Sequence, residues 1–174
     1  MTSSAGPVFR SASAIVCRPA TASHVLRIDG YTHLSQVIGN GHSVFSSLFH
    51  AGGHSWRLML CPNGDAIYKD HVSVFLSLQS SPYPWDGHVW ARPQFSLLDR
   101  LGNPCHVLQT RAFKFTPHEP TWGLADFISR GELEKSEYYQ DDCFAVQCDV
   151  SIPVLRGCRD DMVFITRNMK SAAS

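Results

Sequence analysis

The stretch Phe144-Ala145-Val146-Gln147-Cys148-Asp149-Val150-Ser151-Ile152 decides the fold of this chain. Every second residue in it is apolar and large, and the residues between are small or polar. Because successive side chains of a strand point to opposite faces, a period of two predicts a β-strand with one face in the core. Cys148 then packs in the core. Cys143 lies five residues earlier and faces the opposite side, so the two cannot form a disulfide within this strand.

The same alternation appears in two earlier segments. The segment His71–Gln79 places one set of apolar residues on the core face, namely Val72, Val74, Leu76 and Leu78. Phe75 falls on the other, polar face. Trp56, Leu58 and Leu60 alternate in the same way and are followed by Pro62-Asn63-Gly64-Asp65, where Asn-Gly supplies the positive φ of a tight turn. The chain is therefore expected to reverse there.

Further strands are predicted around His24–Ile28, His88–Leu98 and Cys105–Phe115, with a turn at Asp99–Asn103. Only Gly123–Arg130 has helical spacing, with Leu124, Phe127 and Ile128 at i, i+3 and i+4 and Gly131 placed to end the helix. Because strands follow one another without crossover helices, the expected fold is all-β and antiparallel with one short helix.

Composition excludes several classes of function. The length of 174 residues fits one domain. The 15 Lys and Arg residues balance the 15 Asp and Glu residues, so no net charge attracts nucleic acid or an anionic membrane. No apolar run approaches the roughly 18 to 20 residues that cross a bilayer. The six cysteines form no CxxC pair and no apolar leader is present, which favours a reduced protein of the nucleus or cytoplasm.

Residues 1–22 differ from the rest because they are rich in Ser, Ala and Thr and contain no acidic residue. This composition predicts a disordered tail. A transit peptide, which is also rich in Arg and Ser and poor in acid, is the alternative.

The residues that could carry chemistry favour simpler interpretations. His50 and His54 have i, i+4 spacing, but Gly52-Gly53 would break the helix that brings two imidazoles together. Gly39-Asn40-Gly41 lacks the third glycine of a phosphate loop and is interpreted as a turn. There is no GxSxG motif. We therefore expect no catalytic residue, no metal and no cofactor.

A series of ordered motifs resembles the MATH (meprin and TRAF homology) domain over residues about 22–152. The motifs are His24-Val25-Leu26-Arg27-Ile28-Asp29-Gly30-Tyr31, Ser43-Val44-Phe45-Ser46-Ser47, Gly52-Gly53-His54-Ser55-Trp56-Arg57-Leu58, Cys61-Pro62-Asn63-Gly64, Val72-Ser73-Val74-Phe75-Leu76-Ser77-Leu78, Phe95-Ser96-Leu97-Leu98-Asp99, Trp122-Gly123-Leu124-Ala125-Asp126-Phe127-Ile128-Ser129-Arg130 and Asp141-Asp142-Cys143-Phe144-Ala145-Val146. They are similar to those of the BTB/POZ and MATH domain-containing proteins of grasses and of speckle-type POZ protein. The resemblance implies an eight-stranded antiparallel sandwich at 23–152, preceded by a tail at 1–22 and followed by an extension at 153–174.

The resemblance also implies a function. Relatives bind short extended Ser/Thr-rich peptides of protein substrates in a groove, as the substrate-recognition part of a cullin-type ubiquitin ligase adaptor. Carried over by position, the groove residues are Phe75, Pro93, Phe113, Trp122, Gly123 and Leu124. Pro93 and Leu124 replace aromatic residues of the relatives, and Pro120-Thr121 replaces a polar pair, so we expect this chain to bind a different motif.

The ligase relatives continue into a BTB domain, which needs about 100 residues or more. Residues 153–174 offer only a possible strand at Met162–Thr166 and are too short for it. Recruitment of a cullin would then need a BTB domain supplied elsewhere. The alternative is a stand-alone MATH protein that competes for partners. A deubiquitinase, which would need a separate protease domain, is not expected.

Overall fold

The computed structural model describes residues 1–2, 4–8, 11–80 and 87–159. The chain divides into two compact units. The first consists of Met1–Arg18 and Val154–Ser174, and its described part holds the beginning of β1 and the end of β10. The second, Pro19–Pro153, holds every other element. The strand predicted at Met162–Thr166 lies outside the described residues.

In the described residues, ten strands form two five-stranded sheets. The first sheet has the order β1-β10-β6-β7, with β8 also paired to β6, and its strands are β1 (Ala14–Asp29), β6 (Val89–Leu98), β7 (Pro104–Gln109), β8 (Phe113–Phe115) and β10 (Cys143–Arg159). The second sheet has the order β2-β4-β5-β9, with β3 also paired to β4, and its strands are β2 (Val44–Phe45), β3 (Phe49–Ala51), β4 (His54–Cys61), β5 (His71–Ser80) and β9 (Thr121–Ser129). The predicted all-β antiparallel sandwich is confirmed, and three of the ten strands have only two or three residues.

The core lies between the two sheets and follows the alternation in the sequence. The apolar residues of the deciding stretch, from Phe144 to Ile152, are all buried, and Cys148 among them is completely covered. The largest side chains with almost no exposed surface are Trp56, Phe95, Phe115 and Phe127. Trp56 and Phe115 come from different sheets and meet edge to face, with 5.1 Å between ring centroids. Aromatic and aliphatic burial of this kind is the main stabilising term of a sandwich.

The prediction of a helix at Gly123–Arg130 is wrong, because all of these residues up to Ser129 belong to strand β9. The register of β9 against β5 shifts between Val72 and Val74, so three residues of β9 lie opposite Ser73 alone. This bulge turns both Phe127 and Ile128 into the core. Two adjacent buried residues after Leu124 imitate the i, i+3, i+4 spacing of a helix.

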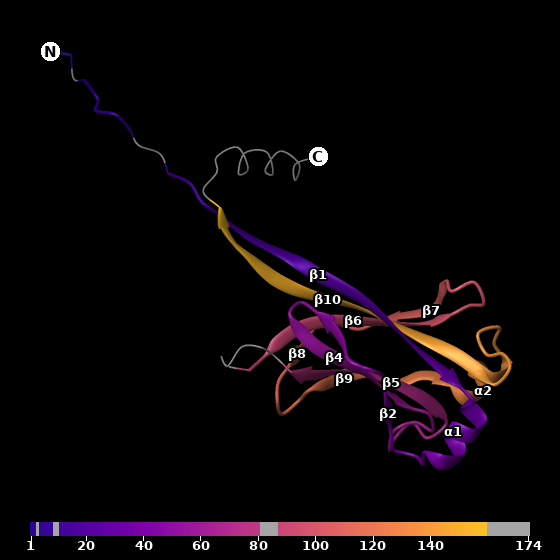
Figure 1. Ribbon diagram of the computed structural model, residues 1–174. Helices are drawn as coiled ribbons and strands as arrows, with labels where there is room; N and C mark the ends of the chain where they lie inside the picture. Colours follow the sequence, from indigo (N-terminus) through magenta and orange to yellow (C-terminus); the bar gives the residue numbers. More distant parts are fainter. Residues whose placement is uncertain (3, 9–10, 81–86, 160–174) are drawn as a thin grey trace. The chain divides into compact units, whose positions relative to one another are not determined.

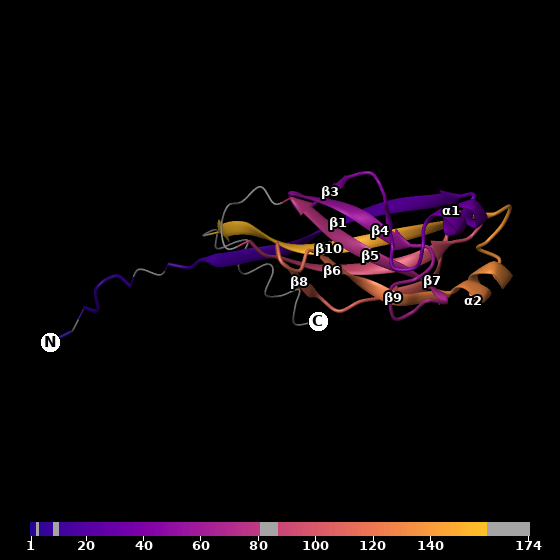
Figure 2. The same ribbon diagram turned by 90° about the horizontal axis from the view of Figure 1, so that it is seen from below.

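Two short helices are present in the described part of the chain, and both lie at the same end of the sandwich, away from β8 (Figures 1 and 2). Helix α1 (Tyr31–Val37) follows Gly30, whose φ of 79° suits glycine. Helix α2 (Arg130–Lys135) begins directly after β9, where the Ser129 side chain accepts a hydrogen bond from the backbone N–H of Glu132. Gly131 therefore lies near the beginning of a helix and does not end one. None of the described helices is long and apolar enough to span a membrane.

The first strand also begins earlier than expected. It was predicted at His24–Ile28, but β1 extends from Ala14, within the segment whose composition resembles a tail. Residues 14–22 alternate weakly and contain no large buried side chain, so composition obscured the strand. The turn at Pro62–Asp65 is confirmed: Gly64 has a φ of 70°, and a Cβ there would lie 1.8 Å from the carbonyl oxygen of Tyr68.

Candidate functional site

The cross-strand register of β4, β5 and β9 places most of the predicted groove residues. Phe75 lies opposite Met59 on β4 and opposite Gly123 on β9. Directly opposite residues of an antiparallel pair share a face of the sheet. Since Val74 and Leu76 on either side of Phe75 are buried in the core, Phe75 and its partners lie on the face turned away from the core. We call this the outer face.

Phe75 is only partly buried, which confirms that it lies off the core face. Its neighbour Gly123 has no side chain, and an added Cβ would lie 2.2 Å from the carbonyl oxygen of Val74 and 2.5 Å from Cα of Phe75. Only glycine lets β9 approach β5 this closely. As a consequence, no side chain of β9 stands between the Phe75 ring and the other edge of β9.

Trp122 and Leu124 lie on the opposite face from Phe75, because they pair with Leu76 and Val74. The Trp122 ring stacks on Phe113 with 4.3 Å between centroids and 5° between planes. The guanidinium carbon of Arg111 lies 5.0 Å from the centroid of the same ring. We call Phe113, Trp122 and Arg111 the Trp122 stack. The indole Nε1 is buried without a hydrogen-bond partner among the described residues.

Pro93 lies in the first sheet, on the strand to which Phe113 is paired, and not on β5 or β9: Phe113 lies opposite Ala91, two residues before Pro93. Pro93 itself lies opposite Val150 of β10 and is buried. The carbonyl oxygen of Pro93 accepts two hydrogen bonds from Thr110, one from the backbone N–H at 3.1 Å and one from the side-chain hydroxyl at 2.8 Å. A proline in this position serves the packing of β6 and lies away from the outer face.

Strand β9 is the last strand of its sheet. Within the described residues, β5 pairs with one of its edges and no strand pairs with the other. Near the end of β9 the carbonyl oxygen of Phe127 lies 2.8 Å from Nε2 of His106, a residue of β7. The unpaired edge at Thr121–Leu124 remains available to another chain.

The sequence reasoning missed three outer-face residues beside Phe75, namely Arg57, Met59 and Thr121. Arg57 on β4 lies opposite Ser77 on β5, and Ser77 lies opposite Thr121 on β9, so a second row runs parallel to Met59, Phe75 and Gly123. The Arg57 Nε atom is buried without a partner in the described part. The alternation of Arg57 and Met59 with Trp56, Leu58 and Leu60 could have placed both on this face. No sequence signal indicated that Thr121 would lie there.

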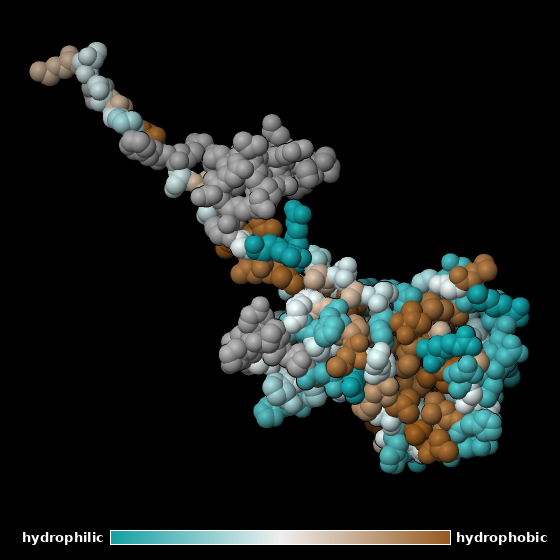
Figure 3. Space-filling view, in the orientation of Figure 1, coloured by the Kyte–Doolittle hydropathy of each residue, from teal (hydrophilic) through white to brown (hydrophobic). Residues whose placement is uncertain are grey.

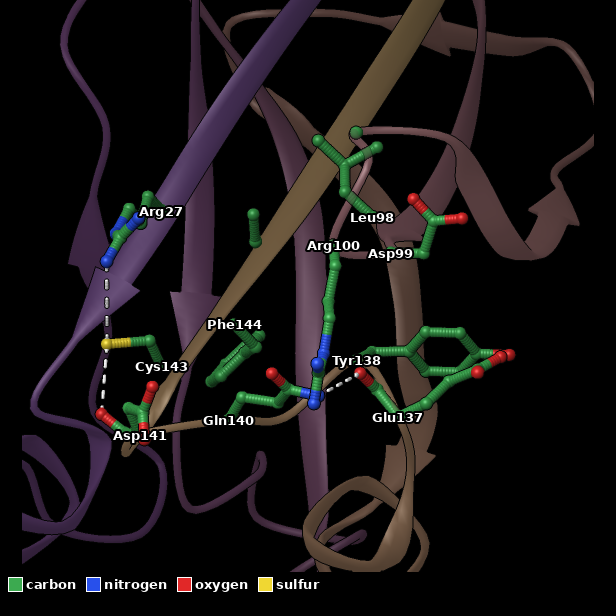
Figure 4. Close-up of a pocket in the computed structure, with 12 residues that line it drawn as sticks. Arg27, Leu98, Asp99, Arg100, Glu137, Tyr138, Gln140, Asp141, Cys143 and Phe144 are labelled. Carbon is green, nitrogen blue, oxygen red and sulfur yellow. Dashed lines mark hydrogen bonds between the residues drawn. The ribbon is translucent and has the colours of Figure 1, made fainter.

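A cavity of about 360 Å³ lies at the end of the sandwich that carries the helices. Figure 4 shows Arg27 and Arg100 on two sides of it, with Cys143 and Gln140 between them. Two of its charged groups have protein partners: Arg27 pairs with Asp29 at 3.5 Å, and the Asp99 carboxylate accepts backbone N–H bonds from its own turn, which lower its pKa. None of the predicted groove residues lines this cavity, so it is a weaker candidate than the β5–β9 region.

Hydrophobic side chains also gather on the face seen in Figure 3, in the part of the second unit where β1, β2 and α1 lie. The exposed apolar residues of these elements include Val25, Val37 and Phe45, with exposed fractions of 46%, 77% and 49%. Phe45 lies opposite Met59 and so extends the outer-face row of Met59 and Phe75. Val37, on α1, lies outside this row and provides a control for it.

The titratable groups do not suggest acid–base or thiol chemistry. Burial raises the pKa of the Cys148 thiol far above its usual value and raises the pKa of the Cys61 thiol as well. A raised thiol pKa reduces the fraction of reactive thiolate. Burial lowers the pKa of His54, which keeps its imidazole neutral. In the described residues no group of three or more His, Cys, Asp or Glu side chains could hold a metal ion.

Comparison with known proteins identifies the family. The sequence profile of the MATH domain matches residues 23–150. BTB/POZ and MATH domain-containing protein 4 of Arabidopsis thaliana is 33% identical over 150 residues, which cover 80% of this chain and 31% of that protein. BTB/POZ and MATH domain-containing protein 6 of Arabidopsis thaliana is 30% identical over 154 residues, which cover 83% of this chain and 36% of that protein.

A third relative has a different description. Ubiquitin C-terminal hydrolase 12 of Arabidopsis thaliana is 28% identical over 115 residues, which are 62% of this chain and only 10% of that protein. The chain spans about a third of the length of the BTB/POZ relatives. The MATH domain, a protein-interaction module, is named in the descriptions of the BTB/POZ relatives. From the family match, these relatives and the two-sheet sandwich, the chain belongs to the MATH domain family.

Proposed function

We propose that this protein binds short extended peptide segments of other proteins by adding them as a strand to the free edge of β9. One observation carries the proposal: the partly buried ring of Phe75 lies opposite a glycine, next to an edge strand with unpaired backbone groups at Thr121–Leu124. An added strand forms backbone hydrogen bonds with the edge, and alternate side chains enter pockets on the two faces.

The two faces of β9 offer different contacts to such a peptide. On the outer face, a side chain passes over Gly123 and contacts Phe75 and Met59. On the opposite face, the next side chain lies beside Trp122 and Leu124. Five of the six predicted groove residues, all except Pro93, thus contribute to one binding region. The Ser/Thr-rich character of the bound motif remains part of the proposal.

The cellular role that we propose is substrate recognition for a cullin-type ubiquitin ligase, in the nucleus or cytoplasm. Support comes from the relatives described as BTB/POZ and MATH domain-containing proteins. In this role the peptide region selects the substrate, and a BTB domain supplied with it or by another chain recruits the cullin. The alternative role is a stand-alone module that competes for the same partners without recruiting a ligase.

The test compares three variants of the full chain in pull-downs from plant cell extract: Phe75→Ala, Trp122→Ala and the control Val37→Ala. Val37 is an exposed apolar residue of α1, which lies at the end of the sandwich away from β8. Circular dichroism and thermal melting establish that each variant is folded. We expect Phe75→Ala to lower the recovery of specific partners at least tenfold. Truncation of a central aromatic residue to alanine typically costs about 2 kcal/mol or more of binding free energy.

Two results would contradict the proposal. Partners recovered equally by wild type, Phe75→Ala and Trp122→Ala would place the binding region elsewhere. Partners lost with Val37→Ala instead would favour the apolar surface near α1. Cullin in the recovered complexes supports the adaptor role, and recovery of substrates without cullin supports the stand-alone role.

A further inference from the structure

The Trp122 stack contains a cation that lies over an aromatic ring and has no ionic partner among the described residues. The Arg111 guanidinium lies over the Trp122 ring at 5.0 Å from its centroid. Arg111 is exposed, and neither it nor the nearby Lys114 forms an ion pair in the described part of the chain. A guanidinium that stacks on an aromatic ring uses its flat face, which leaves the N–H donors at its edge free.

These donors suit an anion with two oxygens in reach, and among unmodified side chains that anion is a carboxylate. The guanidinium edge matches the two oxygens of a carboxylate and forms paired hydrogen bonds with it. Because the guanidinium rests on the Trp122 ring, which itself stacks on Phe113, less side-chain freedom is lost on binding. The stack thus prepares Arg111 for a carboxylate.

A shallow cavity of about 490 Å³ lies beside the stack and is lined by Arg111, Phe113, Lys114, Glu119 and other residues of the β8 region. Its charged side chains are two cations and one carboxylate, which leaves one net positive charge. Trp90, with an exposed fraction of 48%, lines the same cavity and offers apolar contact. The surroundings of Arg111 therefore favour an acidic side chain over a basic one.

We propose that the peptides bound along β9 carry an aspartate or glutamate that pairs with Arg111, an inference that rests on the proposed function. The register fixes where this residue stands. Phe75 faces one side of β9 and Trp122 faces the other, so an added strand contacts them with side chains of opposite orientation. Side chains of opposite orientation lie an odd number of positions apart in a strand. The acidic residue of the peptide should therefore lie one or three positions from the apolar peptide residue that contacts Phe75.

The experiment selects a display library of random 12-residue peptides on the full chain. In the enriched sequences, we expect Asp or Glu at an odd separation from a large apolar residue. Fluorescence anisotropy with one enriched peptide then measures the affinity of variants. We expect Arg111→Gln to weaken binding about tenfold, because paired hydrogen bonds between charged groups are worth about that much at a partly exposed site. Selection on Arg111→Glu should replace the acidic residue with Lys or Arg.

The control is Arg100→Gln, an exposed arginine at the opposite end of the sandwich, which should leave the affinity unchanged. Enriched peptides that depend on Phe75 but show no acidic preference, or an acidic residue at even separation, would overturn this inference and leave the proposed function intact. An Arg111→Gln variant that melts earlier but binds equally well would show that the stack only stabilises the fold. If no peptide is enriched, or if enriched peptides bind Phe75→Ala and Trp122→Ala unchanged, the proposed function fails and this inference with it.

Discussion

Replacement of Gly123 by alanine tests the close approach of β9 to β5 on which the binding region depends. The new Cβ would lie 2.2 Å from the Val74 carbonyl oxygen and 2.5 Å from Cα of Phe75. Favourable contacts between heavy atoms need about 3.5 Å, so β9 must retreat by about 1 Å. Both obstacles are backbone atoms, which cannot rotate away as a side chain can. The strain therefore falls on the hydrogen bonds between the two strands.

The cost of overfilling a packed region is about 1 to 3 kcal/mol, and we expect the upper half of this range here. For a chain of this size, each kcal/mol lowers the melting temperature by roughly 2 to 4 °C, so Gly123→Ala should lower it by about 4 to 12 °C. The assay is thermal unfolding followed by circular dichroism. Peptide affinity should also fall, because the methyl group stands between Phe75 and the edge of β9.

The control is Gly131→Ala in helix α2. An added Cβ at Gly131 meets no atom within 4 Å, and alanine favours a helix by up to about 1 kcal/mol over glycine. Its melting temperature should equal or exceed that of the wild type. A Gly123→Ala variant that melts with the wild type would refute the close approach of the two strands and, with it, the explanation for the partly buried Phe75 ring.

Two further predictions concern stability. Burial lowers the pKa of His54, so the unfolded chain binds more protons than the folded chain below pH about 6.5. The free energy of unfolding should therefore fall as the pH drops through that value. Urea titrations at pH 7.5, 6.5 and 5.5 should show a smaller fall for His54→Phe than for the wild type. Equal slopes would show that His54 does not contribute. The buried Ser73 hydroxyl accepts a hydrogen bond from the backbone N–H of Asp65 at 3.2 Å and donates one to the Ala125 carbonyl oxygen at 2.5 Å, so Ser73→Ala should cost about 1 to 3 kcal/mol in urea unfolding. A loss below about 0.5 kcal/mol would show that the bulge of β9 does not need this contact.

The alternation of the sequence was sufficient to predict the sandwich and one side of the candidate site. Phe75 stands among polar residues in a strand whose other residues form the core, so its position off the core followed from the period of two alone. The burial of Cys148 and the turn at Pro62–Asp65 followed from equally local rules. These predictions succeed because the direction of a side chain in a strand depends only on its parity along the chain.

The sequence could not reveal features that depend on which strands pair and in which register. The bulge opposite Ser73 made β9 resemble a helix, because it turned Phe127 and Ile128 to the same side. Pairing placed Trp122 on the face opposite to Phe75 and Pro93 in the other sheet. Parity within one strand is thus set by the sequence itself. The relation between strands is set by the packing of the whole core, since a shift of one residue in register reverses every face.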